Sequence, residues 1–73
     1  MLYIKLDTLA EANALNSRVT ANCIADSKWT DGVTNNYCNP DWNQDIQKWL
    51  VPVLPGYEQY FTEAEMENAY TNN

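Results

Sequence analysis

The stretch that decides the fold is Asp7–Cys23, which reads Asp-Thr-Leu-Ala-Glu-Ala-Asn-Ala-Leu-Asn-Ser-Arg-Val-Thr-Ala-Asn-Cys. It combines a start signal for a helix with a sustained helical period. Asp7 can cap the helix, because its carboxylate can accept hydrogen bonds from the free amides of the first turn. At about 100° per residue one apolar stripe forms, and Glu11 and Arg18 point away from it. The stripe consists of Leu9, Ala12, Leu15, Val19 and Cys23. We therefore predict a helix that begins after Asp7 and ends near Asn22.

The segment before this helix has the composition of a strand. Residues 2–6 are apolar except for Lys5, and most of them favour extended structure. We predict a strand over 2–6, joined to the helix by a tight corner at Asp7.

The middle of the chain is polar. Residues 25–36 indicate mainly a loop, with a turn at Asp31-Gly32. Residues 33–38 predict a short second strand, which Asn39-Pro40 ends.

The segment after Pro40 supports two interpretations. One interpretation is an amphipathic helix, with Asn39 as its N-cap and Pro40 at its first position. Apolar residues then recur at the helical spacing i, i+4, i+7 and i+8, namely Trp42, Ile46, Trp49 and Leu50. Residues 48–54, in contrast, have the β-branched and aromatic content of a strand, in which Pro52 would suit an edge or an end. We favour a helical turn or loop over 40–46 followed by a strand over 47–53.

The C-terminal part begins with a turn at Pro55-Gly56 and an aromatic cluster of Tyr57, Tyr60 and Phe61. Thr62-x-x-Glu65 is the pattern of a capping box, and Phe61 and Met66 are spaced as a hydrophobic staple. We predict a helix over 63–70 that turns Met66, Ala69 and Tyr70 toward the core.

These elements define an α+β fold in a single domain, residues 1–73. It is a small two-layer domain with one main helix on a short, three-stranded sheet and a short C-terminal helix. A domain of 73 residues is near the lower limit at which one core suffices, so stabilisation by a partner is expected.

The charge excludes some classes of partner. Ten acidic and four basic side chains give a net charge of −6, and the basic residues are scattered. Phosphate backbones and anionic membranes need clustered Lys and Arg, so we expect no direct contact with nucleic acid or membrane. The N-terminal residues lack the pattern of a signal peptide, which predicts a cytoplasmic place of synthesis and free thiols at Cys23 and Cys38.

No catalytic set is present, and we expect neither a cofactor nor a metal. The chain has no histidine, only two cysteines and only two glycines, which removes the common nucleophilic, zinc and phosphate-loop sites. Asp41 and Asp45 could form a carboxylate pair, but their context is that of solvated turn residues. The oxygen ligands at alternate positions 39–45 resemble the start of a calcium loop, yet the required Gly and Glu positions hold other residues in either register.

The aromatic residues exceed what one small core needs, and tryptophan and tyrosine are enriched at protein interfaces. We therefore predict a protein interface that includes Trp29, Trp42, Trp49, Tyr57 and Tyr60.

The layout of the chain resembles small uncharacterised proteins encoded in tailed-phage genomes near structural genes. The motifs that carry the resemblance are the corner Lys5-Leu6-Asp7-Thr8 before an Ala-rich helix, the strand Trp49-Leu50-Val51-Pro52, and Gly56-Tyr57-Glu58 followed by the capped Phe61-Thr62-Glu63-Ala64-Glu65-Met66. It covers both ends of the chain and leaves out residues 25–46. No functional residue carries over from such proteins. The resemblance implies a viral origin and a place in or near the virion.

Two hypotheses follow from the sequence. The first is a small phage structural or virion-associated protein, not an enzyme, that contacts itself or other virion proteins and is made in the host cytoplasm. The alternative is an acidic phage inhibitor that imitates phosphates and binds a host nucleic-acid-binding defence protein. A phosphate mimic needs its carboxylates in a row on one face, whereas here they are spread along the chain from Asp7 to Glu67.

Overall fold

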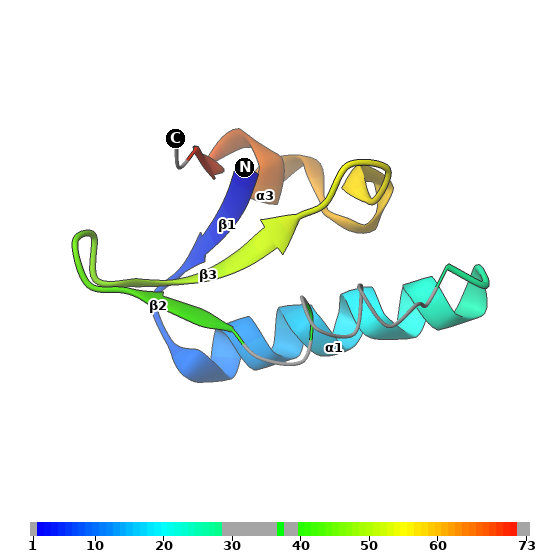
Figure 1. Cartoon of the computed structure of the whole chain (residues 1–73), viewed down its shortest axis with the longest axis horizontal. Helices are drawn as coiled ribbons and strands as arrows, with labels where there is room; N and C mark the ends of the chain where they lie inside the picture. The colour runs from blue at the N-terminus through cyan, green and yellow to red at the C-terminus, as the bar shows by residue number, and fades with distance from the viewer. Residues whose placement is uncertain (1, 29–36, 38–39, 72–73) are drawn as a thin grey trace.

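A four-stranded antiparallel sheet forms one layer of the molecule, and a long helix packs against it (Figure 1). The computed structural model describes residues 2–28, 37 and 40–71. Within them the elements in chain order are β1 (Leu2–Leu6), α1 (Leu9–Ala25), β2 (Asp41–Asn43), β3 (Lys48–Val53), the 3-10 turn η1 (Glu58–Tyr60), α3 (Glu63–Glu67) and β4 (Tyr70–Thr71). The strand order is β2-β3-β1-β4. The α+β class, the main helix on a small sheet and the short C-terminal helix are confirmed. Of the four strands, β1 and β3 were predicted, whereas β2 and β4 were not.

The corner between β1 and α1 differs in one detail from the sequence prediction. Thr8, not Asp7, is the N-cap of α1, and its Oγ1 accepts a hydrogen bond from the Glu11 amide at 3.1 Å. Asp7 instead forms an ion pair with Lys48 at the start of β3. Because this ammonium group stabilises the charged carboxylate, the pKa of Asp7 lies below its usual range. The prediction of Asp7 as cap is therefore wrong, while the tight corner is confirmed.

The buried face of α1 follows the predicted stripe, except at its first position. Four residues of the stripe are buried: Ala12, Leu15, Val19 and Cys23. Leu9 is 44% exposed. It lies about 75° around the helix from the centre of the other four, so it falls at the edge of the stripe. The helix continues to Ala25, three residues beyond the predicted end.

Residues 41–53 form a hairpin, so the helical interpretation of this segment is wrong. β3 confirms the strand predicted over 47–53, but β2 occupies part of the stretch that we expected to be a turn or loop. The hairpin turn is residues 44–47, where Asn43 Oδ1 accepts hydrogen bonds from the amides of Asp45 and Ile46 at 3.0 and 3.2 Å. This local capping by an Asn side chain favours a turn over a helix.

The strand predicted over 33–38 and the turn at Asp31-Gly32 lie outside the described residues, with the exception of Tyr37. Tyr37 has a helical backbone and is buried in the core, so the strand prediction is wrong at this position. Its hydroxyl donates to the carbonyl oxygen of Pro52 at 2.7 Å. Pro52 fits in β3, an inner strand, because the pairing with β2 ends at Leu50. The missing N–H of Pro52 therefore removes no hydrogen bond to β2.

The C-terminal segment confirms the predicted turn and cap. Gly56 has a φ of +89°, which glycine adopts without strain. The capping box between Thr62 and Glu65 is present. The helix α3 is shorter than predicted, because the chain leaves it after Glu67 and pairs Tyr70 with Tyr3 in the sheet.

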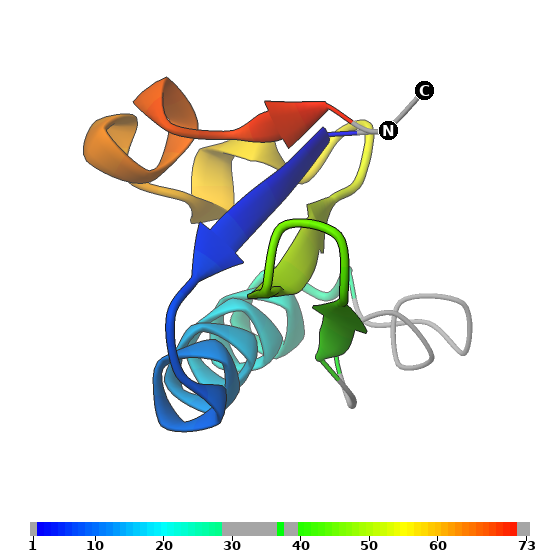
Figure 2. The same ribbon diagram turned by 90° about the vertical axis from the view of Figure 1, so that its left-hand side faces the viewer.

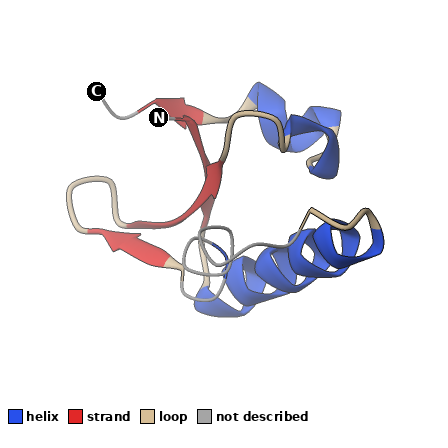
Figure 3. Cartoon of the chain, turned by 45° about the vertical axis from the view of Figure 1, so that its right-hand side comes forward, coloured by secondary structure: helices blue, strands red, loops and turns tan. Residues whose placement is uncertain are grey.

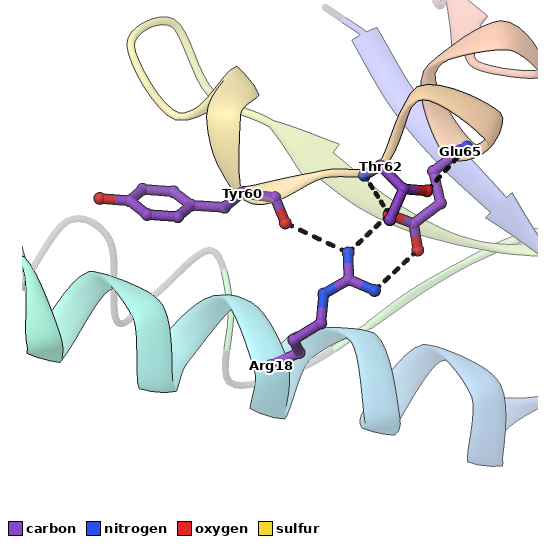
Figure 4. A network of polar contacts seen from close by, with 4 residues as sticks. All are labelled: Arg18, Tyr60, Thr62 and Glu65. Atoms are coloured by element: carbon purple, nitrogen blue, oxygen red, sulfur yellow. Dashed lines mark hydrogen bonds and ion pairs between the residues drawn. The ribbon is translucent and has the colours of Figure 1, made fainter.

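One polar network joins this segment to α1 (Figure 4). The Arg18 guanidinium contacts both carboxylate oxygens of Glu65, at 2.5 and 3.1 Å, and Nη2 also donates to the carbonyl oxygen of Tyr60 at 3.1 Å. The network holds η1 and α3 over α1. The core between them includes Tyr60 and Phe61, while Met66 and Ala69 pack against it as predicted.

Candidate protein interface

Two tryptophans lie in contact on the hairpin formed by β2 and β3, at the edge of the sheet that β2 forms. Trp42 on β2 lies directly opposite Trp49 on β3, with ring centroids 5.2 Å apart and ring planes tilted by 58°. Tilted aromatic pairs of this kind are favourable. Trp49 is half-buried and packs against the core, whereas Trp42 is 46% exposed. The inner ring thus supports an outer ring that is about half exposed to solvent.

The hairpin that carries this pair projects away from α3 and η1 (Figure 3). β2 is an edge strand of only three residues, and β4 forms the opposite edge of the sheet (Figure 2). The Trp42 indole N–H donates to Gln44 Oε1 in the hairpin turn at 3.0 Å. Because its polar group is already bonded, the indole offers a partner its apolar face and edge.

The charged residues closest to Trp42 in the sequence are acidic. Asp41 precedes it in β2 and Asp45 lies in the turn; both are exposed, and within the described part of the chain neither takes part in an ion pair. The nearest cation in sequence, Lys48, is bound to Asp7. Because successive side chains of a strand point to opposite faces, Asp41 lies on the other face of the sheet from Trp42 and Trp49. We call the exposed Trp42 ring and the Trp49 ring that it contacts the Trp42 surface.

The predicted interface tyrosines lie away from the hairpin, with Tyr60 buried and Tyr57 half-buried. Tyr57 and Tyr60 form a second aromatic pair, with ring centroids 5.9 Å apart. The Tyr60 side chain is buried and donates its hydroxyl hydrogen to Asp26 at 2.7 Å; this hydrogen bond raises the pKa of Tyr60 to about 12. Tyr57 donates to the Lys28 carbonyl oxygen at 2.9 Å, and the Lys28 ammonium lies 5.2 Å from the centre of its ring.

These contacts tie the end of α1 to the 55–60 segment, so the structure divides the five predicted interface residues. It brings Trp42 and Trp49 together on the hairpin and places Tyr57 and Tyr60 together at a separate place, between the end of α1 and η1. Trp29 lies outside the described residues. Sequence reasoning missed two further exposed apolar side chains, Leu9 and Ile24. Ile24 was detectable, because it follows Cys23 of the stripe and is therefore turned out of it.

A shallow groove of about 420 Å³ runs along the side of α1 that includes Ile24. Its lining also contains Asn16 and Tyr37. Asn16 is only 5% exposed, and its side-chain amide makes no hydrogen bond within the described part of the chain. Sequence reasoning missed this buried amide, which lies beside the apolar stripe of α1.

The remaining reactive groups do not form a site in the described ranges. Cys23 is a free thiol there, and burial raises its pKa. Among residues 2–28, 37 and 40–71, no three His, Cys, Asp or Glu side chains gather as metal ligands would. In the same residues no helix has the length and hydropathy needed to cross a membrane.

Comparison with family models, with curated proteins and with solved structures gives no match for this chain. The Trp42 surface is then the feature of the molecule from which a function can be inferred.

Proposed function

We propose that the protein is a small, non-catalytic protein that works by contacting other proteins through the Trp42 surface, and that it is a phage structural or virion-associated protein. The observation that carries the first part is the 46% exposure of Trp42 on a half-buried Trp49. Large exposed aromatic side chains lose unfavourable contact with water when a partner covers them.

The arrangement of the pair suits a binding contact. Tryptophan is among the residues that contribute most at protein interfaces, and its side chain loses little rotational freedom on binding. Here Trp49 and the hydrogen bond to Gln44 hold Trp42 in place before any partner arrives. A preformed contact residue lowers the entropic cost of association.

The assignment to a virion is supported by the resemblance of both ends of the chain to small tailed-phage proteins. We propose that the partners are other virion proteins or further copies of this chain, and that the protein is made in the host cytoplasm and resides in the virion. The net charge of −6 supports contacts with proteins rather than with nucleic acid or anionic lipid.

The alternative, an inhibitor that imitates phosphates, has less support. Such a protein needs several free carboxylates on one face. Two of the carboxylates are occupied by cations, Asp7 by Lys48 and Glu65 by Arg18. Asp26 accepts the hydroxyl hydrogen of Tyr60. We therefore favour contact with proteins through Trp42 over imitation of phosphates.

Mass spectrometry of purified virions of the encoding phage tests the proposal. We expect the chain in a fixed ratio to the major virion proteins, and we expect Trp42→Ala to reduce its incorporation. Ile24→Ala is the matched control, because it removes an exposed apolar side chain (57% exposed) from α1 and leaves the hairpin intact. Absence of the chain from virions would overturn the virion assignment, and equal incorporation of both variants would overturn the role of Trp42.

A further inference from the structure

The edge strand β2 is complementary to itself when it is read in the opposite direction. We propose that two copies of the chain pair their β2 strands antiparallel, with the two Trp42 residues opposite each other at the two-fold axis, and so join their sheets into one. This inference rests on the proposed function and names a second copy as the partner of the Trp42 surface.

The first support is the free edge of β2. In the described part of the chain, β2 pairs with β3 on one side and no strand covers its other side (Figure 2). The N–H and C=O groups of an antiparallel strand alternate between its two sides, so part of those in β2 point away from β3. The backbone of any extended segment can pair with such groups. The side chains of β2 must therefore select the partner.

The second support is the order of the side chains in β2. In an antiparallel pair centred on Trp42, Asp41 of each copy lies opposite Asn43 of the other. Asn43 Oδ1 holds the hairpin turn by accepting from the amides of Asp45 and Ile46, and its Nδ2 hydrogens are then the donors that it can offer a partner. The Asp41 carboxylate is exposed and takes part in no ion pair within the described residues. A carboxylate opposite an amide donor forms a charge-assisted hydrogen bond, and the two-fold axis forms it twice.

The third support is the exposed ring of Trp42. Strand alternation puts it on the opposite face of β2 from Asp41 and Asn43, the face that also carries Trp49. Directly opposite residues of an antiparallel pair have Cβ atoms about 5 Å apart, so the two Trp42 rings would meet. The rings of both copies would form a row across the joined sheets, with Trp49 at each end. Contact with water, which the 46% exposed Trp42 ring now makes, is lost in this row.

A second copy supplies what each position of the edge requires. The partner strand needs an amide donor opposite Asp41, a flat apolar side chain opposite Trp42 and an acceptor opposite Asn43. Read backwards, β2 presents these three groups in that order. Like charges are not directly opposed, since each carboxylate lies opposite an amide. The pairing is short, with about two to four main-chain hydrogen bonds, so we expect a weak and reversible dimer.

Sedimentation equilibrium of the full-length chain tests the dimer. At about 0.15 M salt the repulsion between acidic copies is screened beyond about 8 Å, and we expect dimers to form as the concentration rises toward about 1 mM. Trp42→Ala should weaken association at least about tenfold, because each copy loses a central tryptophan. Ile24→Ala is the matched control, since it removes an exposed apolar side chain from α1 and should associate as the wild type does. Circular dichroism verifies that both variants are folded.

A second pair of variants tests the register. Asp41→Ala removes the carboxylate opposite Asn43 of the other copy, and we expect the dimer to weaken about three- to tenfold. Asp45→Ala removes the same charge from the exposed hairpin turn, where no pairing is proposed, and should not weaken the dimer. Isotope-filtered NMR of a mixture of labelled and unlabelled chains should also show nuclear Overhauser effects between β2 of one copy and β2 of the other.

The opposite results would overturn the inference. A chain that stays monomeric at about 1 mM would exclude a second copy as the occupant. A dimer that Ile24→Ala weakens as much as Trp42→Ala would lie elsewhere on the molecule. Equal effects of Asp41→Ala and Asp45→Ala, or no Overhauser effects between the two β2 strands, would contradict the register. None of these results would contradict the proposed function, which can use a different virion protein as partner and fails separately in the virion experiment.

Discussion

Arg18 and Glu65, which are 47 positions apart in the chain, meet in a two-pronged ion pair that joins α1 to α3. The same Glu65 carboxylate accepts a hydrogen bond from the Thr62 amide at 2.7 Å and thereby closes the capping box of α3. One side chain thus both starts the short helix and fixes it to the long one. A five-residue helix is too short to be stable by itself, so its place depends on these contacts.

Thr62→Ala is expected to destabilise the protein by about 0.5–2 kcal/mol, because the Glu65 amide loses its acceptor, Thr62 Oγ1, at 3.2 Å. Urea unfolding midpoints of wild type and variant measure the loss. Thr62→Ser is the control, since it retains the oxygen and should stay near wild type. An unchanged midpoint in Thr62→Ala would mean that this cap contributes nothing to folding.

The ion pair also predicts a dependence of stability on pH. Burial of Glu65 opposes its charged form, but hydrogen bonds from Arg18 and the Thr62 amide outweigh burial, so its pKa lies below the ordinary 4.5. A carboxyl group whose pKa is lower in the folded than in the unfolded state stabilises the fold above the unfolded value. That contribution is lost as pH falls from about 4.5 through the folded pKa.

Urea titrations between pH 3 and pH 7 check this expectation. Glu65→Gln should lower the stability at pH 7 and make the stability less dependent on acid pH, because glutamine has no carboxylate to be protonated. Glu67→Gln, at an exposed position of the same helix, should keep the wild-type slope. If both variants give the same slope, the acid dependence arises elsewhere.

Much of the fold was predictable because its signals are local. The strand 2–6, the stripe of α1 and the Thr62–Glu65 box are each determined by residues close in sequence, and the structure confirms them. The wrong predictions concern segments whose structure depends on contacts with residues far away in the sequence. Asp7 does not cap α1, because its carboxylate is bound by Lys48, which lies 41 positions away in the sequence. The amphipathic helix that was one interpretation of the segment after Pro40 does not form, because β1 offers a long edge to which β3 can bind.

Tyr37 has a role that no sequence pattern revealed. Its hydroxyl donates to the Pro52 carbonyl oxygen and accepts from the Leu54 amide at 3.4 Å, inside the core. Tyr37→Phe leaves that buried carbonyl without this donor, so we expect a loss of about 1–3 kcal/mol in the free energy of unfolding. Tyr57→Phe is the control, because its hydroxyl bond lies at the surface. Equal losses in the two variants would contradict the buried role of Tyr37.

The Tyr37 hydroxyl also predicts that the protein loses stability at alkaline pH. Burial raises the pKa of Tyr37 to about 12, so its protonated form is favoured by folding. The stabilisation is complete below the ordinary value of 10 and is lost as pH rises toward 12. Urea midpoints between pH 9 and pH 12 should therefore fall less steeply in Tyr37→Phe than in Tyr57→Phe. A parallel fall would assign the alkaline transition to other groups.

The position of the candidate interface was predictable only in part, for a physical reason. Composition showed that the aromatic rings outnumber the needs of one core, but it could not tell which rings the core would take. Two contacts decide which rings are buried and which are exposed. Asp26, at the end of α1, accepts the Tyr60 hydroxyl hydrogen, and the strand register places Trp42 opposite Trp49. Both are tertiary relationships.

The two tryptophans of the hairpin are expected to differ in what they contribute to folding. Trp49 packs against the core, so Trp49→Ala should cost about 2 kcal/mol or more. Trp42→Ala removes an exposed ring and one aromatic pair, for which about 0.5–1.5 kcal/mol is expected. Urea unfolding measures both losses, and tryptophan emission provides an independent reading. Because Trp42 is more exposed than Trp49, Trp42→Phe should shift the emission maximum to shorter wavelength, whereas Trp49→Phe should shift it little or in the opposite direction. A larger stability loss in Trp42→Ala than in Trp49→Ala, or an unshifted emission in Trp42→Phe, would place Trp42 in the core and remove the surface on which the binding proposal depends.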